Sequence, residues 1–136
     1  MADSNKISYW QSLEKRTKEF AIRLIRFISE QKKCKEMDVI GYQLIKSGTS
    51  VGANYREANR AESRKDFIHK IALVVKEASE THYWIELLDE LEIGDNDERS
   101  WLLKESDEFL ALFNTSYRSA KSKELQGVSE ESAPYF

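Results

Sequence analysis

Four basic residues near the middle of the chain have a spacing that suits contact with phosphate groups. Arg56, Arg60 and Arg64 recur every four residues, and Lys65 follows directly. Residues four apart share one side of a helix, so this strip would present several cations together. Two glutamates interleave with the strip, and intrahelical or intersubunit ion pairs are the alternative use of these side chains.

A second basic strip lies near the N-terminus, where Arg16, Arg23 and Arg26 follow helical spacing. The charge of the whole chain is −3, but it is unevenly distributed. Residues 1–76 hold 16 Lys and Arg against 9 Asp and Glu, whereas residues 77–136 hold 5 against 15. This asymmetry allows a basic face that approaches nucleic acid, and it equally suits helices or subunits of opposite charge that attract each other.

Several polar residues occupy positions that would face a neighbouring helix. The set comprises Ser47, Ser50, Asn54 and Glu57 in one helical stretch and Glu80 and Thr81 in the next. Ser47 and Asn54 fall within an apolar stripe, where a buried polar group without a partner costs roughly 1–3 kcal/mol. We predict that the set forms an interhelical hydrogen-bond network that fixes helix register, with no catalytic role.

The sequence offers little support for metal, cofactor or small-molecule chemistry. A di-metal centre in a helical bundle needs a Glu-x-x-His pair on each of two helices, and the sequence contains no such pair. Phosphate-binding glycine loops are missing, and Cys34 is the single cysteine. We therefore expect no catalytic residue, metal site, cofactor or small-molecule substrate.

The apolar periodicity predicts an all-α protein made of one domain over residues 1–136. The expected helices cover about residues 8–31, 39–61, 64–91 and 97–123, and residues 124–136 are expected to be disordered. Asp38 is the predicted N-cap of the second helix, Ser63 with Asp66 that of the third, and Gly94 its C-terminal glycine. Short connections then give an up-down-up-down antiparallel four-helix bundle.

The third predicted helix has a second apolar stripe, made by Leu73, Trp84, Leu87 and Leu91. Because one small bundle cannot readily cover this stripe as well as three tryptophans, we predict a homo-oligomer. Charges interrupt every apolar window, and the first ten residues lack the apolar middle of a signal peptide. We therefore expect a cytoplasmic protein without membrane contact.

The central residues resemble a known family. They are Ser47, Ser50, Val51, Ala53, Asn54 and Glu57, then Ser63, Asp66, Phe67 and Lys70, then Glu77, Ala78, Glu80, Thr81 and Trp84. This run resembles the four-helix-bundle proteins encoded in intervening sequences of bacterial large-subunit ribosomal RNA genes. The same family includes the accessory variability determinant of diversity-generating retroelements. The resemblance implies pentameric rings of bundles and, for the retroelement member, partnership with RNA and a reverse transcriptase.

Arg64 and His69 also match the Arg-x4-His spacing of the HEPN ribonucleases, which cleave RNA without a metal ion. Three hypotheses therefore remain. The first is a non-enzymatic oligomeric scaffold, an accessory subunit of an RNA or reverse-transcriptase complex. The others are a protein-only adaptor and a HEPN-like ribonuclease that uses Arg64 and His69.

Overall fold

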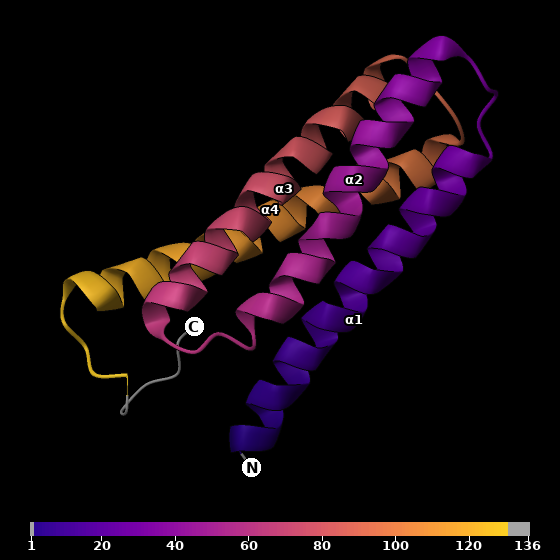
Figure 1. The fold of residues 1–136 in the computed structure, drawn as a ribbon. Helices are drawn as coiled ribbons and strands as arrows, with labels where there is room; N and C mark the ends of the chain where they lie inside the picture. The colour runs from indigo at the N-terminus through magenta and orange to yellow at the C-terminus, as the bar shows by residue number, and fades with distance from the viewer. Residues whose placement is uncertain (1, 131–136) are drawn as a thin grey trace.

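The computed structural model of the chain describes residues 2–130, with side chains from residue 9 onward. Its four helices are α1 (Ala2–Ser29), α2 (Lys35–Ala58), α3 (Arg64–Glu90) and α4 (Asn96–Leu125). Short connections join successive helices, which therefore run in alternating directions (Figure 1). The described residues contain no strand, and the prediction of an all-α four-helix bundle is confirmed.

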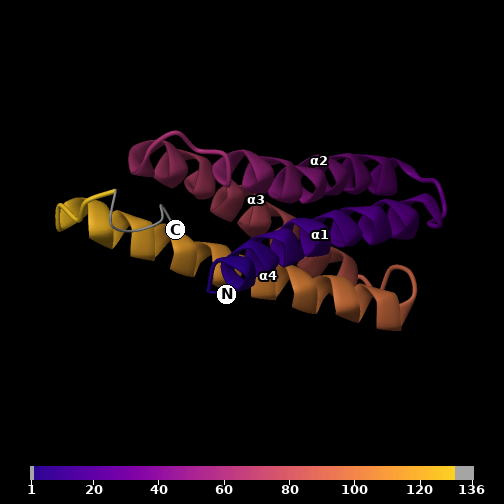
Figure 2. The same cartoon turned by 90° about the horizontal axis from the view of Figure 1, so that it is seen from below.

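The four helices do not pack equally closely. α3 lies against both α2 and α4, α1 lies against α2, and the approach of α1 to α4 is the loosest of the four. Figures 1 and 2 both show the C-terminal end of α4 extending away from α1. Long side chains therefore have to close the seam between α1 and α4.

The core follows the predicted helical periodicity most closely on α3. Its buried apolar residues recur at the three- and four-residue steps of one helix face, and they are Phe67, Ile71, Val74, Ala78, Ile85 and Leu88. Aromatic rings fill the space between α1 and α4, where the Phe20 ring lies 5.4 Å from that of Phe109 and 6.3 Å from that of Trp101. Such clusters contribute through both apolar burial and ring geometry.

The first two helices begin earlier than predicted. α1 begins at Ala2 instead of about residue 8, and α2 begins at Lys35 instead of after Asp38. Asp38 is not the N-cap, because its own N–H donates to the carbonyl of Cys34 at 3.0 Å inside the first turn. Glu36 and Asp38 place negative charge in that turn, which favours the positive end of the helix.

One predicted end of α3 is confirmed and the other is wrong. Ser63 is the N-cap, and its hydroxyl accepts from the N–H of Asp66 at 3.1 Å. At the C-terminal end the left-handed residue directly after the C-cap is Glu92, with φ 54°, whereas Gly94, with φ 79°, lies two residues later. The N–H of Ile93 returns to the carbonyl of Leu88 at 3.0 Å, which completes a Schellman turn before Gly94 is reached.

The helix α4 and the segment after it extend further than predicted. α4 continues to Leu125, and a second Schellman turn follows, with Gly127 at φ 69° and the N–H of Val128 bonded to the carbonyl of Lys123 at 3.0 Å. Residues 126–130 then return toward the start of α3 (Figure 1). The expectation of disorder from residue 124 is thus wrong for residues 124–130, and residues 131–136 lie outside the described part. Within that part, no helix combines the length and the apolar character that crossing a membrane requires.

Candidate nucleic-acid interface

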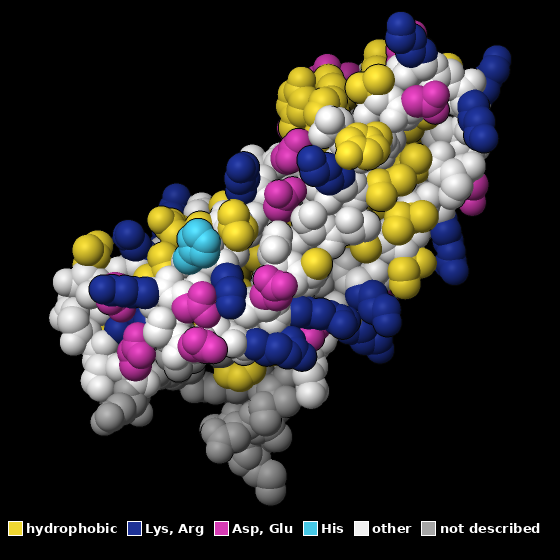
Figure 3. All heavy atoms as spheres, viewed as in Figure 1, with side chains coloured by type: hydrophobic (Ala, Val, Ile, Leu, Met, Phe, Trp, Pro, Cys, Tyr) yellow, Lys and Arg dark blue, Asp and Glu magenta, His cyan; other side chains and the backbone are white. Residues whose placement is uncertain are grey.

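Three cations of the predicted central strip are exposed where α2 ends and the chain turns toward α3. We call Arg56, Arg60 and Lys65 the basic corner. The Nη1 atom of Arg60 donates to the backbone carbonyl of Arg56 at 2.9 Å, which holds this guanidinium against the end of α2. Figure 3 shows Lys and Arg side chains gathered at this end of α2, beside α1. The corner presents positive charge where a polyanion can reach it.

One carboxylate of α1 lies next to the basic corner. The Oε1 atom of Glu14 is 3.6 Å from Nε of Arg56, and its Oε2 atom accepts from Nδ2 of Asn59 at 3.0 Å. The side chain of Arg56 is 48% exposed, so water screens this pair and its contribution is small. Arg56 therefore remains able to exchange Glu14 for another anion.

A second carboxylate near the corner is engaged within its own helix end. Asp66 accepts from the backbone N–H of Glu62 and from Nζ of Lys70, each at 3.1 Å. The hydrogen bond from Glu62, followed by that from Lys70, holds the pKa of Asp66 below its ordinary value. Asp66 thus stays ionised at neutral pH, and its known contacts do not involve the neighbouring Lys65.

A groove between α1 and α2 adjoins the basic corner. Its volume is about 300 Å³. It is lined by Glu14, Thr17, Lys18, Ala21, Thr49, Gly52, Ala53 and Arg56. Gly52 makes the two helices approach closely, since a Cβ atom there would lie 3.0 Å from Oγ1 of Thr17. Lys18 and Arg56 thus lie across one groove from each other, and Lys18 extends the positive surface of the corner onto α1.

Arg64, the fourth cation of the strip, is not part of the exposed surface. Its side chain is 1% exposed. The guanidinium donates to the backbone carbonyls of Val128 and Ser129, and Nη1 is 3.7 Å from a carboxylate oxygen of Glu124. The prediction that Arg64 joins the exposed strip is therefore wrong for this conformation, because the C-terminal segment covers it.

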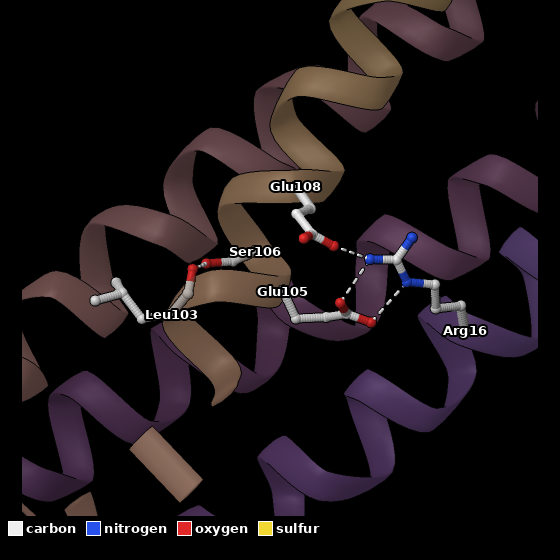
Figure 4. A network of polar contacts seen from close by, with 5 residues as sticks. All are labelled: Arg16, Leu103, Glu105, Ser106 and Glu108. Carbon is white, nitrogen blue, oxygen red and sulfur yellow. Dashed lines mark hydrogen bonds and ion pairs between the residues drawn. The ribbon is translucent and has the colours of Figure 1, made fainter. Parts of the chain in front are cut away.

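The first arginine of the α1 strip lies in the seam between α1 and α4. Arg16 donates from Nε to Oε2 of Glu105 at 2.9 Å and from Nη2 to Oε1 at 2.7 Å, and Nη2 also pairs with Glu108 (Figure 4). The hydrogen bond to Glu105 is the main cause that raises the pKa of Arg16. Burial acts in the opposite direction, and the negative charges of Glu105 and Glu108 raise the pKa further. The guanidinium carbon is 5.2 Å from the centre of the Phe109 ring.

The other two arginines of the α1 strip differ from each other. Arg23 pairs with Glu98 of α4, and its guanidinium carbon lies 3.4 Å from the centre of the Trp101 ring. Arg26 is exposed. The structure therefore assigns Arg16 and Arg23 to holding α1 against α4, and of the predicted α1 strip it leaves Arg26 to the surface.

The predicted polar network between α2 and α3 is not found among the described residues. The hydroxyls of Ser47, Ser50 and Thr81 donate to carbonyls three or four residues earlier in their own helices. Asn54 is half-buried and Glu57 is exposed. Glu80 accepts weakly from Nε1 of Trp84 in its own helix, at 3.5 Å. Hydroxyls satisfied within one helix cannot fix its register against another.

The two residues of the ribonuclease hypothesis do not share a cleft. Arg64 is buried under the C-terminal segment, whereas His69, five residues later on α3, is exposed. Nδ1 of the other histidine, His82, is 2.9 Å from Oγ of Ser106, and Nε2 of the same ring is 3.5 Å from Oε1 of Glu86. Ser106 also donates to the carbonyl of Leu103 at 2.9 Å and is buried, so it is a poor nucleophile (Figure 4). In the described part of the chain, no cluster of three His, Cys, Asp or Glu side chains could hold a metal ion.

Comparison with known proteins places the chain in a family. A sequence model described as 23S rRNA-intervening sequence protein matches residues 10–115. The chain belongs to the 23S rRNA-intervening sequence protein family. The match contains α2, α3, most of α1 and the basic corner. Val128, Ser129 and Glu130, which contact Arg64, lie beyond the matched residues.

A solved structure shares both the fold and much of the sequence. It is the 1.70 Å crystal structure of a protein with unknown function from the S23 ribosomal protein family of Bacteroides thetaiotaomicron. It is 38% identical to this chain with a TM-score of 0.66, and the alignment covers 76% of this chain and 96% of that one. Among curated proteins, no significant match is found.

Sequence reasoning missed two features of this surface. The first is the pair of α4 glutamates that neutralise Arg16 and Arg23 of the α1 strip. The sequence did contain a signal for this pairing, because Arg16 and Arg23 are seven residues apart and so are Glu98 and Glu105. Equal spacing on two antiparallel helices is the pattern of paired charges along a bundle seam. The second is the burial of Arg64, for which the local sequence carries no signal.

Proposed function

We propose that this protein is a non-enzymatic, self-associating helical scaffold that binds RNA through the basic corner, as an accessory subunit of an RNA-containing complex. The observation that carries the proposal is the exposure of Arg56, Arg60 and Lys65 at one end of α2, while Arg16 and Arg23 are engaged by glutamates. The name of the family refers to 23S rRNA, and we therefore propose RNA as the polyanion that binds here. A reverse transcriptase as the protein partner follows from the resemblance to the retroelement accessory protein.

The acidic C-terminal half is compatible with RNA binding in this arrangement. Glu98 and Glu105 of α4 pair with arginines of α1, so part of the negative charge is compensated inside the bundle. Repulsion between exposed charges also falls off over a Debye length of roughly 8 Å at physiological salt. The affinity for RNA at the basic corner would therefore depend more on the cations next to the RNA than on the net charge of the chain.

Self-association draws its support from exposed apolar side chains. The large ones are Tyr9, Ile22, Ile25, Val39, Tyr42, Leu73, Tyr83, Leu91 and Leu125. Figure 3 shows hydrophobic side chains gathered over α2 and the adjoining parts of α1 and α3, toward the α1–α2 turn. Contiguous apolar surface of this kind is typical of protein interfaces. We propose a homo-oligomer whose subunits meet there, with five subunits as the number that the resemblance implies.

The experiment is a comparison of RNA binding at low salt by three forms of the full chain. One variant replaces Arg56, Arg60 and Lys65 by Gln. The control replaces three exposed lysines at the opposite end of α2 by Gln, and it therefore removes the same amount of charge. These lysines are Lys32, Lys33 and Lys35. We expect the corner variant to bind roughly tenfold more weakly or worse, and the control to stay near the unmodified protein. Equal losses in both variants would show that only net charge matters, and absence of RNA binding by the unmodified protein would leave the protein-only adaptor.

A further inference from the structure

Two arginines are buried in this bundle, and they differ in where their partners come from. Arg99 donates to Asp89 at 2.8 Å and to the carbonyls of Ile93 and Gly94 at 2.9 and 3.0 Å, all within ten residues. It fixes the α3–α4 turn. Arg64 instead takes its hydrogen-bond partners from 64 to 66 residues further along the chain. An arginine that serves only a local turn does not need such distant partners.

Two carboxylates, one in the last turn of α4 and one in the segment after it, lie at the positions that an anionic ligand would take. Oε1 of Glu130 accepts from the backbone N–H of Arg64 at 2.8 Å, and Oε2 of Glu124 lies 3.7 Å from Nη1 of Arg64. Arg64 is the first residue of α3, so its N–H has no partner inside the helix. A helix N-terminus with an arginine beside it is suited to phosphate, and here carboxylates of the same chain fill that role.

The present coverage of Arg64 is incomplete. Nε of Arg64 is buried and lacks a hydrogen-bond partner, and among the described residues it is the one buried side-chain nitrogen or oxygen in this condition. The guanidinium donates to two backbone carbonyls, which are neutral, and its carboxylate partner Glu124 is beyond hydrogen-bond distance. A phosphate could offer charged oxygens to the whole fork of the guanidinium. The site is therefore better matched to a phosphate than to the segment that now covers it.

We propose that Arg64 and the first N–H of α3 form a phosphate-binding site for RNA, closed in this conformation by residues 126–130. We call these residues the C-terminal strap. The strap competes with RNA for Arg64, and its release adds a buried cation to the basic corner, where Arg60 and Lys65 are sequence neighbours of the site. The identity of the ligand rests on the RNA binding proposed above, whereas the strap and the anion site rest on the contacts of Arg64.

The strap depends on one residue that can be altered without changing charge. Gly127 has φ 69°, and a side chain there would meet no atom within 4 Å. Valine at this position would therefore be strained by its backbone conformation alone, which disfavours the closed strap. If the open form is the form that binds, its population and the apparent RNA affinity should both rise by about fivefold to thirtyfold.

The test uses the full chain and two separate probes. The strap variants are Gly127→Val and the double substitution Glu124→Gln with Glu130→Gln. The controls are Ser119→Val, at an exposed position of α4, and Glu90→Gln with Glu92→Gln, which makes the same charge change at the other end of the bundle. Each form is titrated with a single-stranded oligoribonucleotide at low salt. A second titration with inorganic pyrophosphate follows the backbone amide resonance of Arg64, and circular dichroism confirms that each variant is folded.

The proposal predicts that Gly127→Val binds RNA about fivefold to thirtyfold more tightly than Ser119→Val, and that the double Gln variant of Glu124 and Glu130 also binds RNA more tightly than its charge-matched control. Pyrophosphate should shift the Arg64 amide at lower concentration in the strap variants than in the unmodified chain. A Gly127→Val protein that binds both probes no better than the unmodified chain would overturn the strap. RNA binding that tightens without any response of the Arg64 amide would overturn the site. A pyrophosphate response without RNA binding in any form would remove RNA as the ligand, and with it the function proposed above, while retaining the anion site.

Discussion

Arg16 of α1 and Glu105 of α4 form a two-point ion pair, with Nε 2.9 Å from Oε2 and Nη2 2.7 Å from Oε1. The Glu105 side chain is only 11% exposed. Seven residues further along α1, Arg23 pairs with Glu98, seven residues earlier in α4. These two pairs join the most loosely packed of the contacting helix pairs, and they show why Arg16 and Arg23 are not available as a binding strip.

Removing Arg16 should destabilise the bundle by leaving a largely buried carboxylate without its partner. We expect Arg16→Met to lower the free energy of unfolding by about 2 kcal/mol. Adding Glu105→Gln to this variant should recover part of the loss, because the unpaired charge is then gone. Chemical denaturation of both single variants and the double variant measures the coupling. Arg26→Met, exposed on the same helix, is the control and should stay within about 0.5 kcal/mol of the unmodified protein.

Gly94 should tolerate no side chain, for two separate reasons. Its φ is 79°, and a Cβ atom there would lie 2.5 Å from Cζ of Phe27. We expect Gly94→Ala to lower the free energy of unfolding by about 2–4 kcal/mol, from backbone strain together with displacement of a core ring. Gly127→Ala is the matched comparison, since it has similar strain without a contact, and it should cost about 1–2 kcal/mol at most. Equal losses of unfolding free energy in the two variants would show that the Phe27 ring moves aside without a measurable cost.

Glu77 should make stability depend on pH in the direction opposite to a paired carboxylate. Partial burial, and then the charge of Glu80, raise the pKa of Glu77 above its ordinary value of 4.5. Between the unfolded and the folded pKa the folded state holds more protons, so stability falls as pH rises through that window and stays lower above it. At pH 7, Glu77→Gln should therefore be more stable by a few tenths of a kcal/mol. The gain should vanish below about pH 4 when both proteins are denatured chemically across a pH series.

The self-association proposal predicts a particle larger than the 15.9 kDa chain. Sedimentation equilibrium at micromolar concentration should give a multiple of this mass. Tyr42→Asp places a charge on an exposed apolar position of α2 and should shift the protein toward the monomer without loss of helicity. Thr115→Asp, exposed on α4, should leave the mass unchanged. A monomer in the unmodified protein would contradict the scaffold's self-association.

The sequence predicted the start and extent of α3 well, because Ser63 and Asp66 mark its first turn and apolar residues recur at helical spacing along its whole length. On α2 the same reasoning failed at one position. Steps of three or four residues from Val51 lead to either Asn54 or Tyr55, and the structure buries Tyr55, whose ring lies 4.9 Å from that of Phe113. Apolar ring packing therefore decides the face, and Asn54 moves to the edge of the core.

The candidate site was predictable only where local spacing determines exposure. Arg56, Arg60 and Lys65 lie at the end of a helix, and the pattern around them indicates a polar surface. Arg64 has the same spacing but is buried, because Val128 and Ser129 return to it from the far end of the chain. Helical periodicity describes one helix at a time, so contacts over such a separation are beyond its reach.

The most direct test of the central claim is the salt dependence of RNA affinity. Each phosphate contact on a single strand contributes about −0.7 to the slope of log affinity against log salt. Three contacts from the basic corner predict a slope near about −2 for the unmodified protein, and replacement of Arg56, Arg60 and Lys65 by Gln should bring the slope close to zero. Identical slopes for the two proteins, or no affinity of the unmodified protein at low salt, would contradict RNA binding at this surface.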